Sequence, residues 1–389
     1  MADDANTNDV PPLVVKVDDA HHEANVPLVT LSPSKPRPGL IEAVIWCVIF
    51  LLTQLVTLIC VTGGVLIAYA LQARDPSEFL NDQLNQVAKA TEPQSGQMDT
   101  PPFPNEFGQA LGFGMLGAQF ASLGLILLVL PRRIGKDWKQ QIGLSRPSVL
   151  HILLILLLTP GFILATNGIE ELLQKAVGIT VPNVGKGLTK TFSSSPWLLT
   201  FLAVCFGPGF VEEIWCRGFL GRGLTARYGL NMGVVLTSIL FGLMHSSLTY
   251  AIPVAFMGVY LHFVYLVSRS IWISILLHTL NNSIGVLLSL SSLDKELDAK
   301  LAGRIEIVYL VSFALVLFAS IALWTSRPRI TPLHGKPADQ SRSANWNLNY
   351  PGLSALPHPS ERTIRGPVSP MAMIFTVVLF AVLMYLVFR

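Results

Sequence analysis

Charged residues are scarce in this sequence: Asp, Glu, Lys and Arg make up only 13% of its 389 residues, whereas an average soluble domain carries about 25%. The deficit is uneven, because long apolar runs alternate with short polar stretches. Several of these runs reach the ~20 residues that a helix needs to cross ~30 Å of hydrocarbon. The shortage of charge therefore excludes an ordinary soluble domain. It predicts an all-α, polytopic membrane helix bundle embedded in the lipid bilayer.

Cysteine is also scarce, and its four copies share one setting. All four lie within apolar runs without any CxxC spacing, which argues against a disulfide framework and a thiolate zinc site: Cys47, Cys60, Cys205 and Cys216. The sequence also lacks a basic tract interleaved with aromatic residues, which excludes a nucleic-acid partner. Residues 1–39 lack the apolar core of a signal peptide and are polar and proline-punctuated. We therefore expect a disordered cytoplasmic tail there.

Hydropathy predicts eight or nine transmembrane helices. The nine candidate spans cover residues 41–71, 108–130, 149–168, 197–220, 231–247, 250–268, 271–291, 305–325 and 371–388. The chain then divides into the tail at 1–39, two N-terminal transmembrane helices with an extracytoplasmic loop at 40–130, a transmembrane core at 149–325, a flexible Pro/Ser/Asn-rich linker at 326–370 and a C-terminal transmembrane helix at 371–389.

Lysine and arginine gather after alternate spans, and this pattern sets the predicted orientation. They follow the second, fourth, sixth and eighth spans as Arg132, Arg133, Lys136, Lys139, Arg146, Arg222, Arg227, Arg269, Arg327, Arg329 and Lys336. Short loops that are rich in Lys and Arg stay in the cytoplasm. We therefore expect a multi-pass protein of the plasma (cytoplasmic) membrane with a cytoplasmic N-terminus and, with the ninth span present, an outer C-terminus.

Ionisable residues within the spans concentrate from the fourth to the seventh, and the fourth holds three of them. Glu213 and Arg217 are i,i+4 in the favourable order, so we interpret this pair as structural and electrostatic support. Glu212 points about 100° away from Glu213 on a helix and has no partner within that helix. A buried carboxylate without a counter-ion is suited to take and return a proton near neutral pH. Glu212 is therefore the candidate catalytic acid, and a purely structural ion cluster is the alternative.

Two later spans add polar side chains at helical spacing. His245 closes the run FGLMH in the fifth span, and a lone histidine of this kind is more often a satisfied core residue than a catalyst. His278 and Asn282 are i,i+4 in the seventh span, on one helix face. Such a pair either bonds to neighbouring helices or donates to a developing negative charge.

Taken in order, these patterns read EExxxR, FxxxH and HxxxN. Over residues 196–292 they resemble the CPBP family of intramembrane proteases, which includes the CAAX prenyl endopeptidases and the Abi proteins. The resemblance implies that Glu212 is the catalytic carboxylate and that His245 helps it to activate a water molecule. It further implies that His278 and Asn282 stabilise the oxyanion of the tetrahedral intermediate.

The resemblance also implies a function: an intramembrane endopeptidase that cleaves a peptide or protein substrate at the membrane, either membrane-associated or prenylated as in CAAX-box protein processing. We expect no cofactor, because the HExxH pattern of common zinc proteases is absent. If zinc is bound, Glu212, His245 and His278 are the expected ligands. Two alternatives stay open: a non-catalytic scaffold or immunity protein of the same fold, and a proton-coupled transporter. The lack of inverted repeats counts against the transporter.

Overall fold

The computed structural model describes residues 38–91, 103–178, 191–192, 195–245, 248–291, 297, 300–332, 350–353 and 361–389. All the helices and strands named below belong to one compact unit. The tail predicted at 1–39 lies outside the described residues except for its last two positions.

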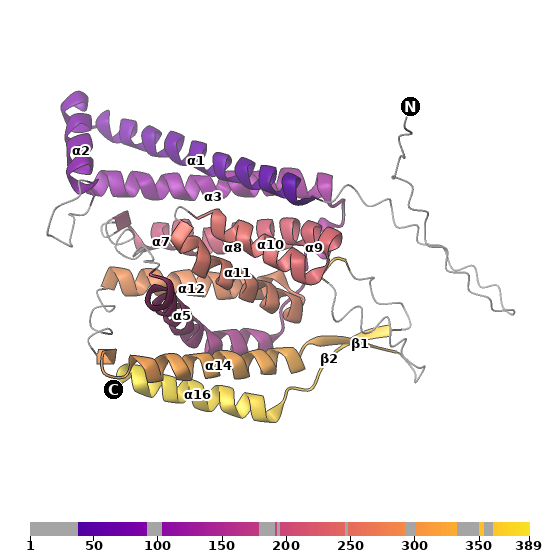
Figure 1. Ribbon diagram of the computed structural model, residues 1–389. Helices are drawn as coiled ribbons and strands as arrows, with labels where there is room; N and C mark the ends of the chain where they lie inside the picture. Colours follow the sequence, from indigo (N-terminus) through magenta and orange to yellow (C-terminus); the bar gives the residue numbers. More distant parts are fainter. Residues whose placement is uncertain are drawn as a thin grey trace, which may run out of the picture. The chain divides into compact units, whose positions relative to one another are not determined.

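The unit consists almost entirely of helices (Figure 1). In chain order they are α1 (Leu40–Ala70), α2 (Pro76–Thr91), α3 (Asn105–Arg133), α4 (Trp138–Gln141), α5 (Val149–Val177), α7 (Trp197–Thr200), η1 (Phe201–Phe206), α8 (Gly207–Glu213), η2 (Ile214–Gly221), α9 (Arg222–Tyr228), α10 (Leu230–Leu243), α11 (Leu248–Ser268), α12 (Ile271–Ser291), α14 (Ile305–Thr325) and α16 (Pro370–Phe388). Two short strands, β1 (Pro328–Pro332) and β2 (Glu361–Arg365), pair antiparallel between α14 and α16.

Eight helices of the described chain are long and apolar enough to cross a membrane, which confirms the predicted all-α polytopic bundle. One of them is the continuous run Trp197–Tyr228, in which η1 and η2 are π-helical segments. The ninth predicted span is also among the eight, as α16. The predicted fifth span differs, because α10 has only 14 residues and is therefore about 21 Å long. The hydropathy estimate placed the end of this span at 247, four residues beyond the last residue of the helix, Leu243.

The helix that carries the two glutamates is packed on its aromatic side against α1. Trp215 of η2 stacks on Phe50 at 5.0 Å between ring centroids, and its edge meets Trp46 at 6.0 Å. Phe219, one turn later, contacts Trp46 at 5.8 Å. Figure 1 shows α1 beside α3 on one flank of the unit and α14 beside α16 on the other, with α8, α10, α11 and α12 between them. The acidic segment of the fourth span therefore lies inside the bundle.

The basic connections gather at one end of the unit. The Ile271 amide after α11 donates to the Gly143 carbonyl after α4, at 3.0 Å. The Arg222 guanidinium, at the start of α9, bonds to Gln141 in α4. Ser326, directly after α14, bonds to His151 at the start of α5, at 3.2 Å. The distribution of Lys and Arg in the sequence requires these connections to lie on one side of the membrane, and the structure places them together. That this side is cytoplasmic stays a prediction.

The described parts of residues 326–370 differ from the solvated, flexible linker expected there. The strands β1 and β2 pair along five residues each. Between them Tyr350 is fully buried, and Leu353 packs against the main hydrophobic core. Composition alone predicted a solvated segment, because a few apolar residues that dock into the bundle leave the average polarity almost unchanged.

Candidate active site

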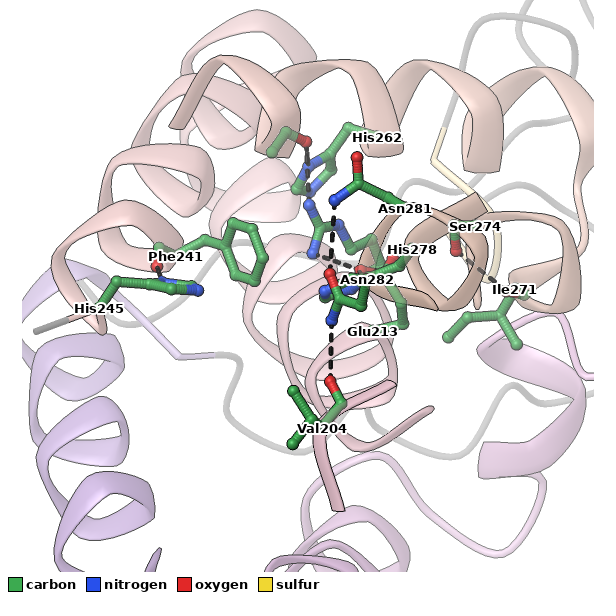
Figure 2. Close-up of polar contacts among 12 residues, drawn as sticks. Val204, Glu213, Phe241, His245, His262, Ile271, Ser274, His278, Asn281 and Asn282 are labelled. Atoms are coloured by element: carbon green, nitrogen blue, oxygen red, sulfur yellow. Dashed lines mark hydrogen bonds and ion pairs between the residues drawn. The ribbon is translucent and has the colours of Figure 1, made fainter. Parts of the chain in front are cut away.

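A fully buried acid, Glu213, lies at the centre of the site (Figure 2). Its Oε1 accepts hydrogen bonds from Arg217 Nη1 and from His278 Nδ1, both at 2.9 Å. The side chains of Glu213 and Arg217 have no exposed surface, and that of His278 has 2%. The i,i+4 ion pair expected from the spacing is therefore present. The hydrogen bond from His278 on α12 is a second contact, which joins the two helices.

Arg217 has further contacts with α10 and α11 besides its ion pair with Glu213. Its Nη2 donates to the carbonyl oxygen of Gly258 in α11 at 3.0 Å. Its guanidinium also lies over the Phe241 ring of α10, 4.5 Å from the ring centroid. A charge removed from water is tolerated only when it is both paired and hydrogen-bonded. Arg217 meets this requirement through contacts with three other helical segments, so it fixes their relative positions.

Glu212 lies in a different environment from its neighbour. It is half-buried, and among the described residues it makes no hydrogen bond or ion pair. The ring of Tyr250, in α11, lies 5.9 Å from that of His245. Glu213 faces α12 through its bond to His278, whereas Glu212 has no such contact with the described residues.

His245 lies two residues after the end of α10, and its tautomer can be inferred from one contact. Its Nδ1 lies 2.9 Å from the carbonyl oxygen of Phe241. Because a carbonyl oxygen can only accept, Nδ1 carries the proton and Nε2 of the neutral ring is the acceptor. Figure 2 shows the Phe241 ring between His245 and His278, with centroid distances of 5.2 and 5.9 Å. The two histidines are therefore brought near each other but are separated by an aromatic ring.

Asn282 is oriented by the π-helical segment η1. Its Nδ2 donates to the Val204 carbonyl oxygen at 3.2 Å, and its Oδ1 accepts from Asn281 at 3.4 Å (Figure 2). A side-chain amide has two N–H donors, and the Val204 bond uses one of them. π-helical turns recur at functional sites, and here η1 and η2 flank the segment that carries both glutamates.

An apolar groove of about 520 Å³ lies between α10 and α11. Leu243 and Ala251, on either side of the connection that holds His245, belong to its wall. Leu243, Val259 and Phe256 are among the exposed large hydrophobic residues of the two helices. The groove therefore has the character of a surface that contacts hydrocarbon.

The residues proposed as zinc ligands do not fit a metal site as they are placed. Within the described residues, no group of three His, Cys, Asp or Glu side chains lies close enough together to hold a metal ion. The proposed chemistry therefore uses no metal, and catalysis without a cofactor stays a prediction.

Three contributors to the site were not identified from the sequence. Phe241 is the aromatic residue of the FxxxH pattern, but the pattern did not reveal that its ring lies between the two histidines. Tyr250 follows His245 by five residues and carries no motif. Gly258 contributes only its backbone carbonyl, which no side-chain pattern can reveal.

Comparison with known proteins identifies the region. Residues 194–284 match the Rce1-like family model, described as type II CAAX prenyl endopeptidase Rce1-like. This match confirms the resemblance noted in the sequence, and it covers less than a quarter of the chain. The matched segment contains all six residues of the predicted site: Glu212, Glu213, Arg217, His245, His278 and Asn282. No curated protein and no solved structure matches the chain.

Proposed function

We propose that this chain is an intramembrane endopeptidase that hydrolyses a peptide bond of a membrane-associated protein, with prenylated, CAAX-like C-termini as its substrate class. The observation that carries the proposal is the buried network of Glu213, Arg217 and His278 within the segment that matches the Rce1-like model. Buried ionisable groups inside a membrane bundle are costly, and they mark functional sites there.

The reaction starts with the activation of water. The Glu212 carboxylate, helped by Nε2 of His245, takes a proton from water, and the resulting hydroxide oxygen attacks the carbonyl carbon of the scissile bond. Glu212 suits this role because no hydrogen bond or ion pair with the described residues occupies its carboxylate. The same acid returns the proton to the amine nitrogen when the C–N bond breaks.

The negative charge that develops on the carbonyl oxygen is stabilised by His278 and Asn282. Glu213 accepts the Nδ1–H hydrogen bond of His278, so Nε2 is the ring nitrogen that donates to the oxyanion, as part of an imidazolium. Asn282 contributes the N–H that the Val204 carbonyl does not use. Donors held in place before the reaction stabilise an oxyanion without any cost of reorganisation.

Substrate binding uses the apolar groove between α10 and α11. A peptide alone has little reason to enter the bilayer, whereas a hydrocarbon chain on the substrate gains about 0.8 kcal/mol for each CH₂ that it buries. The groove begins beside the connection that carries His245. A lipid chain bound in it would therefore bring the attached peptide toward the catalytic groups.

A substitution at Glu212 tests the proposal. We expect Glu212→Gln to abolish cleavage of a fluorescence-quenched peptide that ends in a farnesylated CAAX motif, in purified protein in detergent micelles. The thermal unfolding of the variant should match that of the unmodified protein. Glu106→Gln is the matched control, because Glu106 is also a half-buried glutamate in a membrane-spanning helix and lies outside the matched segment. It should retain full activity.

Two results would contradict the proposal. Retained cleavage in Glu212→Gln would remove this residue from its role, and retained cleavage in His245→Ala as well would exclude the mechanism. No cleavage of this peptide or of its unprenylated form by the unmodified protein would favour the non-catalytic scaffold.

A further inference from the structure

Tyr350 is a buried residue from outside the matched family segment that reaches the helix of the acidic site. Its hydroxyl donates to the backbone carbonyl oxygen of Arg217 at 2.9 Å. Its ring meets the edge of Tyr265 at 5.4 Å and tilts against His262 at 5.9 Å. The side chain has no exposed surface. A tyrosine hydroxyl buried in this way needs its hydrogen bond, because an unpaired one is costly.

The bundle leaves room for this side chain at one glycine. A Cβ on Gly221 would overlap the Tyr350 hydroxyl and would also lie 2.8 Å from His262 Nε2. Gly221 is the last residue of η2, the π-helical segment in which Arg217 lies. The missing side chain at this position is therefore what allows Tyr350 to reach the Arg217 carbonyl.

The four residues 350–353 form a turn that is itself fixed to the bundle. The Leu353 amide donates to the Tyr350 carbonyl at 3.0 Å. Gly352 has a φ of +78°, the positive φ that the third residue of a type II turn requires, and it follows Pro351, a residue common at the second position. A side chain at Gly352 would overlap the Gln141 carbonyl. The turn thus packs closely against η2 at Gly221 and against α4 at Gln141.

Arg222 connects this turn to the helix from the other side. Its Nη2 contacts the Gly352 carbonyl oxygen at 3.4 Å and bonds to the Gln141 side chain. Leu353 packs on the core that also contains Trp215 and Phe219. The turn therefore contacts η2 at the Arg217 backbone carbonyl. It also contacts Arg222, the residue that directly follows η2.

We infer that Tyr350 is a positioning residue for the acidic site: by holding the Arg217 backbone it fixes the turn from which Arg217 reaches Glu213, and Glu213 in turn orients His278. The inference rests on the proposed peptidase function. It assigns a role in catalysis to a segment outside the residues that match the family model. Arg217 is joined to the His278 imidazole by two hydrogen bonds of 2.9 Å, both to Glu213. A shift of the Arg217 backbone therefore also shifts Glu213 and His278.

Tyr350→Phe tests the inference, because it removes the hydroxyl and keeps the ring. With the farnesylated CAAX peptide, we expect kcat to fall roughly three- to tenfold while KM stays unchanged, since small misplacements of catalytic groups are costly. Backbone amides of residues 213–221 should also exchange faster with deuterium in this variant. Gly352→Ala, which displaces the turn from Gln141, should produce the same two effects.

Tyr260→Phe is the matched control, because it also loses one phenol hydrogen bond between distant segments, to Ser320 at 2.8 Å. It should lower the unfolding temperature as much as Tyr350→Phe does, with kcat and exchange at 213–221 unchanged. Equal kcat and equal exchange in the two variants would overturn the inference. The exchange measurement requires no substrate, so it decides this point even if the proposed peptidase function fails in the Glu212→Gln experiment.

Discussion

Glu213→Gln is the substitution for which the structure predicts the largest loss of stability at the site. Glutamine keeps the shape of the side chain and an acceptor oxygen for His278, but it removes the negative charge. Arg217 then keeps its charge with no exposed surface and without its counter-ion, 2.9 Å from a neutral group. Removing one partner of a buried ion pair costs about 3–5 kcal/mol. We expect a loss of this size in the free energy of unfolding, together with loss of cleavage.

The assay is reversible unfolding by SDS in mixed micelles, followed by the fluorescence of the seven tryptophans. The double variant Glu213→Gln/Arg217→Met separates charge burial from shape, because it removes the uncompensated cation as well. It should recover most of the stability, yet remain inactive because His278 has lost its carboxylate partner. A double variant that is as unstable as Glu213→Gln would refute this reasoning.

The chain provides a control with the same spacing in an exposed position. Lys175 and Glu171 form an i,i+4 pair at 2.6 Å, with side chains that are 63% and 33% exposed. Exposed pairs contribute little, because water already solvates both charges. We expect no measurable change in unfolding for Glu171→Gln. Losses of equal size in Glu171→Gln and Glu213→Gln would show that burial of the charge is not the cause.

Three further outcomes follow from the structure. Cleavage should survive dialysis against a zinc chelator, and loss of activity that added zinc restores would show a metal mechanism instead. Gly242→Ala should destabilise the protein by about 1–3 kcal/mol, the cost of overpacking, because a Cβ there would overlap the Ala251 carbonyl, whereas Gly64→Ala meets no atom within 4 Å and should be neutral. Hydrogen bonds from the Ser77 side chain and neighbouring amides lower the pKa of the Asp75 carboxyl. These bonds stabilise α2 fully above the ordinary pKa of the carboxyl, and this stabilisation is lost as the pH falls through the lowered pKa of the folded state. Amide exchange in the first turn of α2 should therefore accelerate only in acid. Asp75→Asn should weaken this dependence on pH.

Sequence reasoning succeeded where the interaction is local. The pair of Glu213 and Arg217 could be predicted because helix geometry alone sets the distance between positions i and i+4. The membrane spans could be predicted for a similar reason, since a helix in hydrocarbon satisfies its own backbone and only needs an apolar surface of sufficient length. Both predictions use no information about which helices are neighbours.

The contacts that complete the site depend on packing between distant segments. His278 reaches Glu213 across 65 residues, and Tyr350 reaches Arg217 across 133. Neither distance follows from helical periodicity. A family pattern marked His278, but it assigned that residue an oxyanion role and did not reveal its bond to Glu213. No pattern pointed to Tyr350, because sequence composition does not distinguish a buried aromatic residue in a polar segment from an exposed one.

The short helix α10 also bears on topology. The connection between α10 and α11 spans residues 244–247, so the two helices form an antiparallel hairpin, whose outer ends lie next to each other. The α9 segment before the hairpin contacts Gln141 through Arg222, and Ser270 after it bonds to the Ser145 carbonyl at 2.8 Å. The chain therefore enters and leaves the hairpin at the same end of the bundle.

It follows that α10 and α11 cross the bilayer together or not at all. A count of eight spans by length alone would place both termini on one side, but the hairpin allows only seven or nine crossings. The start of α1 lies at the basic end, because the Leu40 amide bonds to the Tyr228 hydroxyl at 3.2 Å. The start of α16 follows Gly366, whose amide donates to the Arg327 carbonyl at that end. The C-terminal Arg389 is then opposite to the basic connections (Figure 1), which agrees with the odd number of crossings whether or not the tip of the hairpin reaches the far surface.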